Sequence, residues 1–194
     1  MNYTTEQLSN RITVQEYLRD YVDIPKFLEC CKACPDYGKK WSCPPYDFDV
    51  KDYWNKFNYL YVIGTRIIIP EEETKCSHTE ETLKGFLKNE LSSEKKKLSI
   101  MMHSLEDKYP GSKSLSAGNC DYCKECLRLK EEPCCKPGQM RYSIESLGGD
   151  VGKTTKDLLG LELKWMTEGR MPEHFILVNG LLTTEDLGEK INVS

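Results

Sequence analysis

Cysteine is the residue type with the clearest chemistry in this sequence, which has 194 residues and ten cysteines. Five of them fall within residues 120–135, CDYCKECLRLKEEPCC, and four within residues 30–43, CCKACPDYGKKWSC. Thiols at this density form disulfides, bind zinc or bind an iron–sulfur cluster. The three alternatives predict different compartments and different functions, so the spacing within each group has to decide between them.

The downstream group has the spacing of a cluster-binding loop. Cys120, Cys123 and Cys126 form C-x2-C-x2-C, and Cys134 follows after seven intervening residues. Thiolates at this spacing on an irregular loop can each reach a different corner of one [4Fe–4S] cubane, because the loop wraps the cluster. Zinc needs only two pairs of ligands, so a third closely spaced cysteine favours iron–sulfur. A four-thiolate zinc site made by the pairs Cys120/Cys123 and Cys134/Cys135 is the alternative.

The upstream group offers three ligands. Cys31 and Cys34 form C-x2-C, and Cys43 follows in the run Cys43-Pro44-Pro45. In bacterial ferredoxins, the cysteine that completes a cluster from a distance is followed by proline. Two arrangements are therefore open: these three cysteines bind a second cluster or metal with one coordination position free, or Cys43 completes the downstream cluster. We prefer the first, because each loop has a C-x2-C of its own. A structural zinc that staples the loop is the alternative for this group.

Composition and charge bear on the compartment and the partners. Hydrophobic residues make up 39% and charged residues 30% of the chain, and the formal net charge of −4 argues against nucleic-acid and anionic membrane partners. The N-terminal residues lack a secretory pattern, and the longest apolar-rich segment, residues 58–70, contains Arg66 and is too short to span a bilayer. We expect a cytoplasmic protein with reduced thiols, which favours metal binding over disulfides. The negative charge leaves room for a basic redox partner protein.

Hydrophobic periodicity predicts the elements that position the cysteines. Capping-box pairs at Thr13/Glu16 and Ser77/Glu80 mark two helix starts, and Pro110-Gly111 ends the longer of these helices. The predicted helices span residues 13–22, 25–29, 47–57, 77–109 and 152–160, and the predicted strands span 59–69, 113–117 and 174–182. This order indicates an α/β fold with a small central sheet and flanking helices. We expect a single domain over residues 1–194, with metal-binding cysteine loops at 30–46 and 120–137.

Two further motifs carry less weight. The run GGDVGKTT, residues 148–155, lacks the first glycine of a phosphate-binding loop, because that position is Leu147. We expect Gly148 and Gly149 to form a turn before a helix. Arg141 follows the downstream cysteines. A guanidinium at this place, beside an anionic cluster, would raise the reduction potential of the cluster. An ordinary surface salt bridge is the alternative for Arg141.

Beyond the cysteines, the runs CPDYGKKWSCPPY (34–46), CDYCKECLRLKEEPCCKPGQMRYSIESLGGDVGKT (120–154) and HFILVNGLL (174–182) resemble a family of small, cysteine-rich proteins, mostly of anaerobic bacteria and archaea, that are described as metal-binding. The resemblance spans most of the chain. Its pattern includes the seven candidate ligands together with Tyr37-Gly38, Trp41, Pro44-Pro45, Pro137, Arg141, Ser143, Glu145, Gly148 and Asp150-Val151. Cys30, Cys76 and Cys135 fall outside this pattern. We interpret Cys76 as an isolated free thiol. The resemblance implies metal binding, with iron–sulfur suggested by the cysteine spacing, but it supplies no reaction.

The sequence therefore predicts a metal-binding protein in redox chemistry, an electron carrier or small reductase. Cys120, Cys123, Cys126 and Cys134 are expected to bind a [4Fe–4S] cluster, and Cys31, Cys34 and Cys43 a second cluster or metal. The alternative is a non-enzymatic zinc protein whose two loops rigidify the fold and present a binding surface. Neither a catalytic residue nor a small-molecule substrate is identified.

Overall fold

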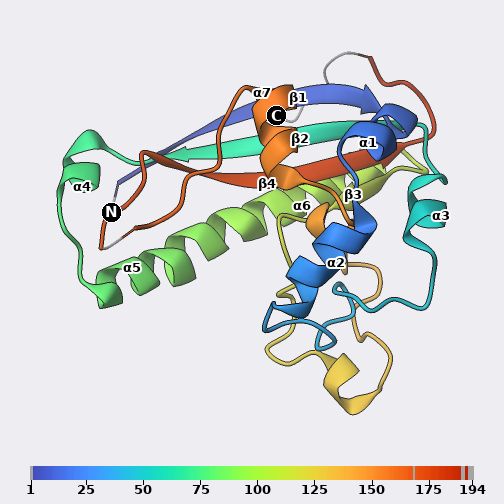
Figure 1. Cartoon of the computed structure of the whole chain (residues 1–194), viewed down its shortest axis with the longest axis horizontal. Coiled ribbons are helices and arrows are strands. Elements are labelled where there is room, and N and C mark those ends of the chain that lie inside the picture. Colours follow the sequence, from blue (N-terminus) through green and yellow to red (C-terminus); the bar gives the residue numbers. More distant parts are fainter. Residues whose placement is uncertain (1, 168, 189–190, 192–194) are drawn as a thin grey trace.

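An antiparallel sheet forms the centre of the structure, a computed structural model that describes residues 2–167, 169–188 and 191. Its strands are β1 (Thr4–Thr13), β2 (Tyr59–Ile68), β3 (Lys113–Leu115) and β4 (His174–Thr183). They lie in the order β1-β2-β4-β3, so β2 and β4 are central (Figure 1). Each neighbouring pair is antiparallel, and β1, β2 and β4 pair along their full length of ten residues.

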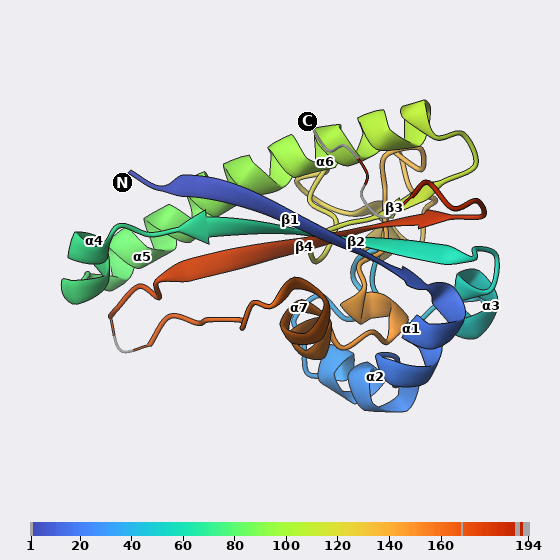
Figure 2. The same ribbon diagram turned by 90° about the horizontal axis from the view of Figure 1, so that it is seen from above.

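Helices lie on both faces of this sheet (Figure 2). The long helix α6 follows one face, and α1, α2 and α7 lie on the other. The helices are α1 (Val14–Asp20), α2 (Ile24–Lys32), α3 (Val50–Trp54), α4 (Glu71–Lys75), α5 (Glu80–Phe86), α6 (Ser92–Lys108) and α7 (Val151–Leu159). A π-helical turn, Leu87–Leu91, joins α5 to α6. In the part of the chain described, no helix is long and apolar enough to cross a membrane.

Strand β2 is buried on both of its faces. Leu60 and Val62 join the core beneath α1, α3 and α7, whereas Tyr61 and Ile63 pack with Met102, Leu105 and Leu181 beneath α6. Alternate side chains of a strand point to opposite faces, so one strand contributes to both cores. The sheet is thus a fixed platform between two helical layers.

The predicted fold class, with a central sheet and flanking helices, is confirmed. The three predicted strands are present within two residues of their expected ends, and α6 ends just before Pro110-Gly111. The predicted capping box is also present: the Thr13 hydroxyl accepts a hydrogen bond from Glu16 N, and the Glu16 carboxylate accepts one from Thr13 N. That residues 1–194 form one domain stays a prediction.

Three local predictions are wrong. Strand β1 was not expected, because its sequence TTEQLSNRIT is polar apart from Leu8 and Ile12. The helix expected over 77–109 begins at Glu80, where the Thr79 hydroxyl caps Thr82 N, so Ser77/Glu80 is not a capping box. Helix α2 continues to Lys32, because the run FLECCK contains no residue that breaks a helix. Cys30 and Cys31 therefore lie in its last turn and not in a loop.

Gly148 fixes the position of α2. Its φ is +82°, and a Cβ on this residue would lie 2.8 Å from Ile24 Cγ1 and 2.9 Å from Ile24 Cα. Asp23 N donates to Gly148 O at 2.9 Å, and Asp150 N donates to Tyr21 O at 2.8 Å. The predicted turn at Gly148-Gly149 is present and holds the start of α2 against the start of α7.

Replacing Gly148 with alanine should therefore destabilise the protein. The added Cβ meets the backbone of Ile24, and the positive φ is unfavourable for alanine, so we expect the free energy of unfolding to fall by roughly 2–4 kcal/mol. Urea denaturation measures this change. Gly85→Ala in α5 is the control, because nothing lies within 4 Å of its added Cβ and alanine is the better helix former. Equal stability of the two variants would contradict this account of Gly148.

Candidate metal centre

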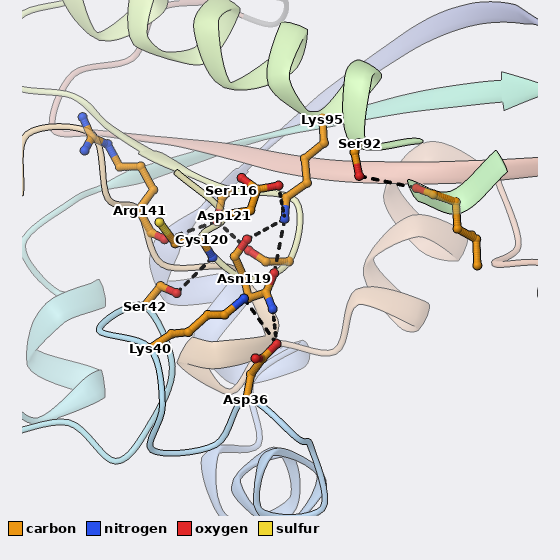
Figure 3. Close-up of polar contacts among 12 residues, drawn as sticks. Asp36, Lys40, Ser42, Ser92, Lys95, Ser116, Asn119, Cys120, Asp121 and Arg141 are labelled. Carbon is orange, nitrogen blue, oxygen red and sulfur yellow. Dashed lines mark hydrogen bonds and ion pairs between the residues drawn. The ribbon is translucent and has the colours of Figure 1, made fainter. Parts of the chain in front are cut away.

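The first cysteine loop (residues 30–46) and the second cysteine loop (residues 120–137) pack against each other beside the sheet (Figure 1). Cys120 N donates to the Ser42 hydroxyl at 3.0 Å, and Trp41 Nε1 donates to Glu132 O at 3.0 Å. Asn119, just before the second loop, donates from its side chain to the Asp36 carboxylate (Figure 3). These contacts join residues about eighty positions apart into one structure.

Arg128 makes the most extensive contact between the loops. Its guanidinium donates to three backbone carbonyls of the first loop, those of Lys40 at 2.8 Å, Cys43 at 2.5 Å and Pro45 at 2.5 Å. The same group lies 5.2 Å from the centroid of the Trp41 ring, a cation–π distance. A planar group with five donors suits such a cluster of acceptors, whereas lysine presents only a point charge.

Helix α6 holds the second loop from the other side. Lys95 Nζ donates to Asn119 O at 2.5 Å and lies 3.5 Å from the Asp121 carboxylate (Figure 3). His103 Nε2 lies 3.1 Å from the hydroxyl of Tyr122, which stands between Cys120 and Cys123. The second loop is therefore fixed both to the first loop and to the sheet's helical layer.

The four predicted ligands of the second loop line one cavity. Cys120, Cys123, Cys126 and Cys134 all lie in the wall of a cavity of about 280 Å³, together with Trp41, Ser42 and Met140. The same wall includes three lysines, Lys40, Lys124 and Lys136, and one acidic residue, Asp121. Soft thiolate donors, a space among them and a surplus of cationic side chains fit a sulfur-ligated, negatively charged group.

The ten cysteines, all within the described residues, are free thiols. Cys123 Sγ and Cys135 Sγ are 3.4 Å apart, well beyond the length of about 2.0 Å for a disulfide bond. This contact brings Cys135 next to Cys123, as the zinc alternative for this loop requires, although Cys135 is not among the four ligands predicted for a cluster.

The upstream cysteines form a separate group. Cys43 is not among the residues that line the cavity of the second loop. Burial, together with the nearby sulfurs of Cys43 and Cys34, raises the pKa of Cys31 to about 11. Burial also raises the pKa of Cys43 and Cys120. A bound cation would reverse these shifts, because metal binding stabilises thiolates and releases their protons.

All but one of the predicted ligands are less exposed than the remaining cysteines. Cys30, Cys76 and Cys135 are exposed, and Cys34 is the only predicted ligand that shares this state. The other six are partly buried: Cys31, Cys43, Cys120, Cys123, Cys126 and Cys134. Across residues 2–167, 169–188 and 191, no three Cys, His, Asp or Glu side chains are arranged to hold one metal ion. The ligand assignments therefore stay predictions.

Arg141 forms a salt bridge, as the alternative for this residue held, but the pair is buried and does not lie on the surface. Its guanidinium donates to the two oxygens of Glu106 on α6 at 2.6 and 2.5 Å, and the side chains of Arg141 and Glu106 are only 7% and 14% exposed. It also donates to the carbonyls of Gly138 and Met140, both at 2.8 Å. Arg141 thus ties the chain after the second loop to α6.

Glu106 is an acid that the sequence did not single out. Burial raises its pKa, but the hydrogen bonds from Arg141 and Ser114 outweigh burial and lower the pKa to about 2. The His103 pKa is lowered by burial and by Arg141, whose guanidinium lies 3.1 Å from His103 Nδ1. The sequence of α6 alone gave no indication of this network, because the two partners of Glu106, Ser114 and Arg141, lie outside the helix.

Glu106→Gln should lower the free energy of unfolding at pH 7 by on the order of 3 kcal/mol, because it removes one partner of a buried ion pair. The folded-state pKa lies below the ordinary value of 4.5, so the stabilisation is complete above pH 4.5 and is lost as pH falls toward 2. Urea denaturation at pH 7 and pH 3 should show a smaller loss of stability on acidification in the variant. An equal loss of stability in both proteins would contradict the lowered pKa of Glu106.

Arg128→Lys should loosen the contact between the loops, because lysine cannot donate to three carbonyls at once. We expect the two loops to become more sensitive to limited proteolysis, and the free energy of unfolding to fall by about 1–3 kcal/mol. Arg19→Lys is the control, since the Arg19 side chain is 70% exposed and pairs with its neighbour Asp20. Unchanged cleavage within residues 30–46 and 120–137 would show that Arg128 does not hold the loops together.

Comparison with known proteins gives one match. A family model described as "Predicted metal-binding protein (DUF2284)" matches residues 19–182. That range includes both cysteine loops and Arg128, Arg141 and Glu106. No curated protein and no solved structure matches the chain. Because the family model covers most of the sequence, this chain belongs to the predicted metal-binding protein family DUF2284.

Proposed function

We propose that this protein is an iron–sulfur protein of redox metabolism, an electron carrier or a small reductase. Cys120, Cys123, Cys126 and Cys134 bind a [4Fe–4S] cluster, and the upstream cysteines Cys31, Cys34 and Cys43 bind a second cluster or metal. Membership in a family of predicted metal-binding proteins supports the presence of metal. The choice of iron–sulfur rests on the second loop.

The cavity shared by the four thiols carries this proposal. Zinc–thiolate bonds of about 2.3 Å draw four sulfurs around a single ion, and so leave no space among them. The four cysteines here line a cavity of about 280 Å³ instead. An iron–sulfur cluster brings inorganic sulfide as well as iron and needs such space. The third cysteine of C-x2-C-x2-C, superfluous for a zinc knuckle, also lies in the cavity wall.

The charge around the cavity supports the same choice. A [4Fe–4S] cluster with four thiolate ligands carries net negative charge. Lys40, Lys124 and Lys136 in the wall are placed to offset this charge, and Trp41 contributes an aromatic side chain to the same wall. Lys40 comes from the first loop, so the contact between the loops contributes to the site.

The contact between the loops also favours electron transfer between the two cysteine groups. Ser42 connects them, since its hydroxyl accepts from Cys120 N at 3.0 Å and lies 3.8 Å from Cys43 Sγ. A second metal at the upstream group would be linked to the first through this one residue. When bound, an iron with a free coordination position would act there as a Lewis acid. Reduced thiols in such numbers suit the cytoplasm, and the net charge of −4 suits a basic redox partner protein.

A zinc protein without enzymatic activity is the second candidate. It is favoured by the contact between Cys123 Sγ and Cys135 Sγ, because 3.4 Å is short enough for two sulfurs to share one ion. In this arrangement Cys120 and Cys134 complete the site, and the loops serve as an interaction surface.

Protein purified without oxygen should be brown, with a broad visible absorbance that bleaches on reduction, and should contain iron and acid-labile sulfide. Elemental analysis and Mössbauer spectroscopy measure the number and type of clusters. Colourless protein with stoichiometric zinc from the same preparation would refute the iron–sulfur proposal. Purification in air is not a fair test, because exposed clusters degrade and zinc can replace them.

Cysteine variants identify the ligands in the same assay. Cys123→Ser should abolish cluster content or solubility, whereas Cys76→Ser, the matched control at an exposed cysteine outside both loops, should leave both near wild type. Cys135→Ser separates the two candidates, since it should retain iron if a cluster is bound and lose zinc if the zinc site is correct. Equal damage from Cys123→Ser and Cys76→Ser would show that the ligand set is misassigned.

A further inference from the structure

Two thiols of the second cysteine loop are in direct contact. Cys123 Sγ and Cys135 Sγ are 3.4 Å apart, and among the hydrogen bonds of the described residues no other one joins two thiols. The residues next to them are also connected, because Lys136 Nζ donates to Tyr122 O at 3.2 Å. The two chain segments are therefore held side by side at the place where the thiols meet.

The two thiols differ in their surroundings. Cys123 is partly buried and lines the cavity proposed for the cluster, whereas Cys135 is exposed and does not belong to the cavity wall. Cys135 is thus a fifth thiol beside the four ligands, open to a reagent from solvent. Its neighbour Cys134 is a poor partner, because adjacent Cα atoms are about 3.8 Å apart and disulfides usually span about 4.4–6.8 Å between Cα atoms. Cys123 is the thiol in position to react with Cys135.

We propose that Cys123 and Cys135 form a reversible disulfide once the cluster is lost, and that this bond keeps the site empty until it is reduced. The sulfurs have to approach each other by roughly 1.4 Å, from 3.4 Å to a bond length of about 2.0 Å. Both residues lie outside helices and strands, so a small movement of irregular chain can supply this approach. The inference rests on the proposed function in one respect, that Cys123 is a ligand of the cluster and Cys135 is not.

A small disulfide, such as oxidised glutathione, is the oxidant. The Cys135 thiolate attacks one glutathione sulfur, forms a mixed disulfide and releases the other half as glutathione thiolate. The Cys123 thiolate then attacks the Cys135 sulfur and releases the second glutathione. Two protein thiols thus lose two electrons and two protons, and one glutathione disulfide gains them. A bound cluster opposes the second attack, because the sulfur of Cys123 is then engaged by iron.

Full-length protein purified without oxygen tests the proposal, with oxidised glutathione and a metal chelator as the reagents. Wild-type protein should lose its iron and two free thiols, and should rebuild the cluster from iron and sulfide only after dithiothreitol has restored both thiols. Iron analysis and thiol alkylation measure these changes. Trypsin cleaves after Arg128 and Lys130, so Cys123 and Cys135 fall on different peptides, which mass spectrometry should find joined through these two residues.

The variant Cys135→Ser should contain as much iron as wild type before treatment, and should rebuild its cluster afterwards without dithiothreitol. Cys30→Ser is the matched control. Cys30 is exposed and adjacent to the predicted ligand Cys31, as Cys135 is to Cys134, but no hydrogen bond of the described residues joins it to a second thiol. Cys30→Ser should therefore require dithiothreitol, as wild type does.

A disulfide between other cysteines in treated wild-type protein, or no disulfide, would overturn the proposal, as would a need for dithiothreitol that persists in Cys135→Ser. Loss of metal from untreated Cys135→Ser would make Cys135 a ligand and would overturn the proposal as well. Metal analysis of the untreated samples tests the proposed function separately. Zinc in place of iron, with the metal retained in Cys135→Ser and the Cys123–Cys135 disulfide formed in treated wild type, would refute the iron–sulfur proposal alone.

Discussion

Arg128 contacts the first cysteine loop through the carbonyls of Lys40, Cys43 and Pro45, and this contact is the constraint on which the candidate centre depends. Neither loop can hold its cysteines by regular hydrogen bonding, because the first has no helix beyond the end of α2 and the second has only a short 3-10 turn, Leu127–Lys130. A loop of this kind pays a large conformational entropy cost unless other groups fix it. The two loops fix each other, and the metal sites proposed for them are therefore not independent.

The rest of the fold supplies the anchors for that pair of loops. Gly148 lets α2 approach closely, which sets the end of the helix where Cys31 lies. On the other face, Glu106 and Lys95 of α6 hold Arg141 and Asn119 at either end of the second loop. Strand β2 is buried on both faces, so the sheet keeps these two sets of anchors on opposite sides. Loop geometry is thus determined by the contact between the loops together with these anchors on both faces of the sheet.

The cysteine spacing predicted both groups of candidate ligands, the resemblance of residues 34–46, 120–154 and 174–182 predicted the metal-binding family, and hydrophobic periodicity predicted three of the four strands. What the sequence could not provide was the contact between the groups. Arg128 bonds to backbone carbonyls more than eighty residues away, and such contacts leave no periodicity and no preferred residue type at the acceptor. The pairing of Glu106 with Arg141 escaped prediction because the two residues lie 35 positions apart, whereas the proximity of Cys135 to Cys123 was expected only under the zinc alternative. Strand β1 escaped because it is polar.

That polarity has a further consequence for how molecules of this protein meet each other. Strand β1 lies at the edge of the sheet, and within the described residues it pairs only with β2. A ten-residue edge strand is a template on which another chain can add, and charged or polar side chains oppose such addition. Glu6, Gln7, Asn10 and Arg11 place hydrophilic groups along this edge. The composition that hides the strand from sequence analysis therefore protects the protein against aggregation by sheet extension.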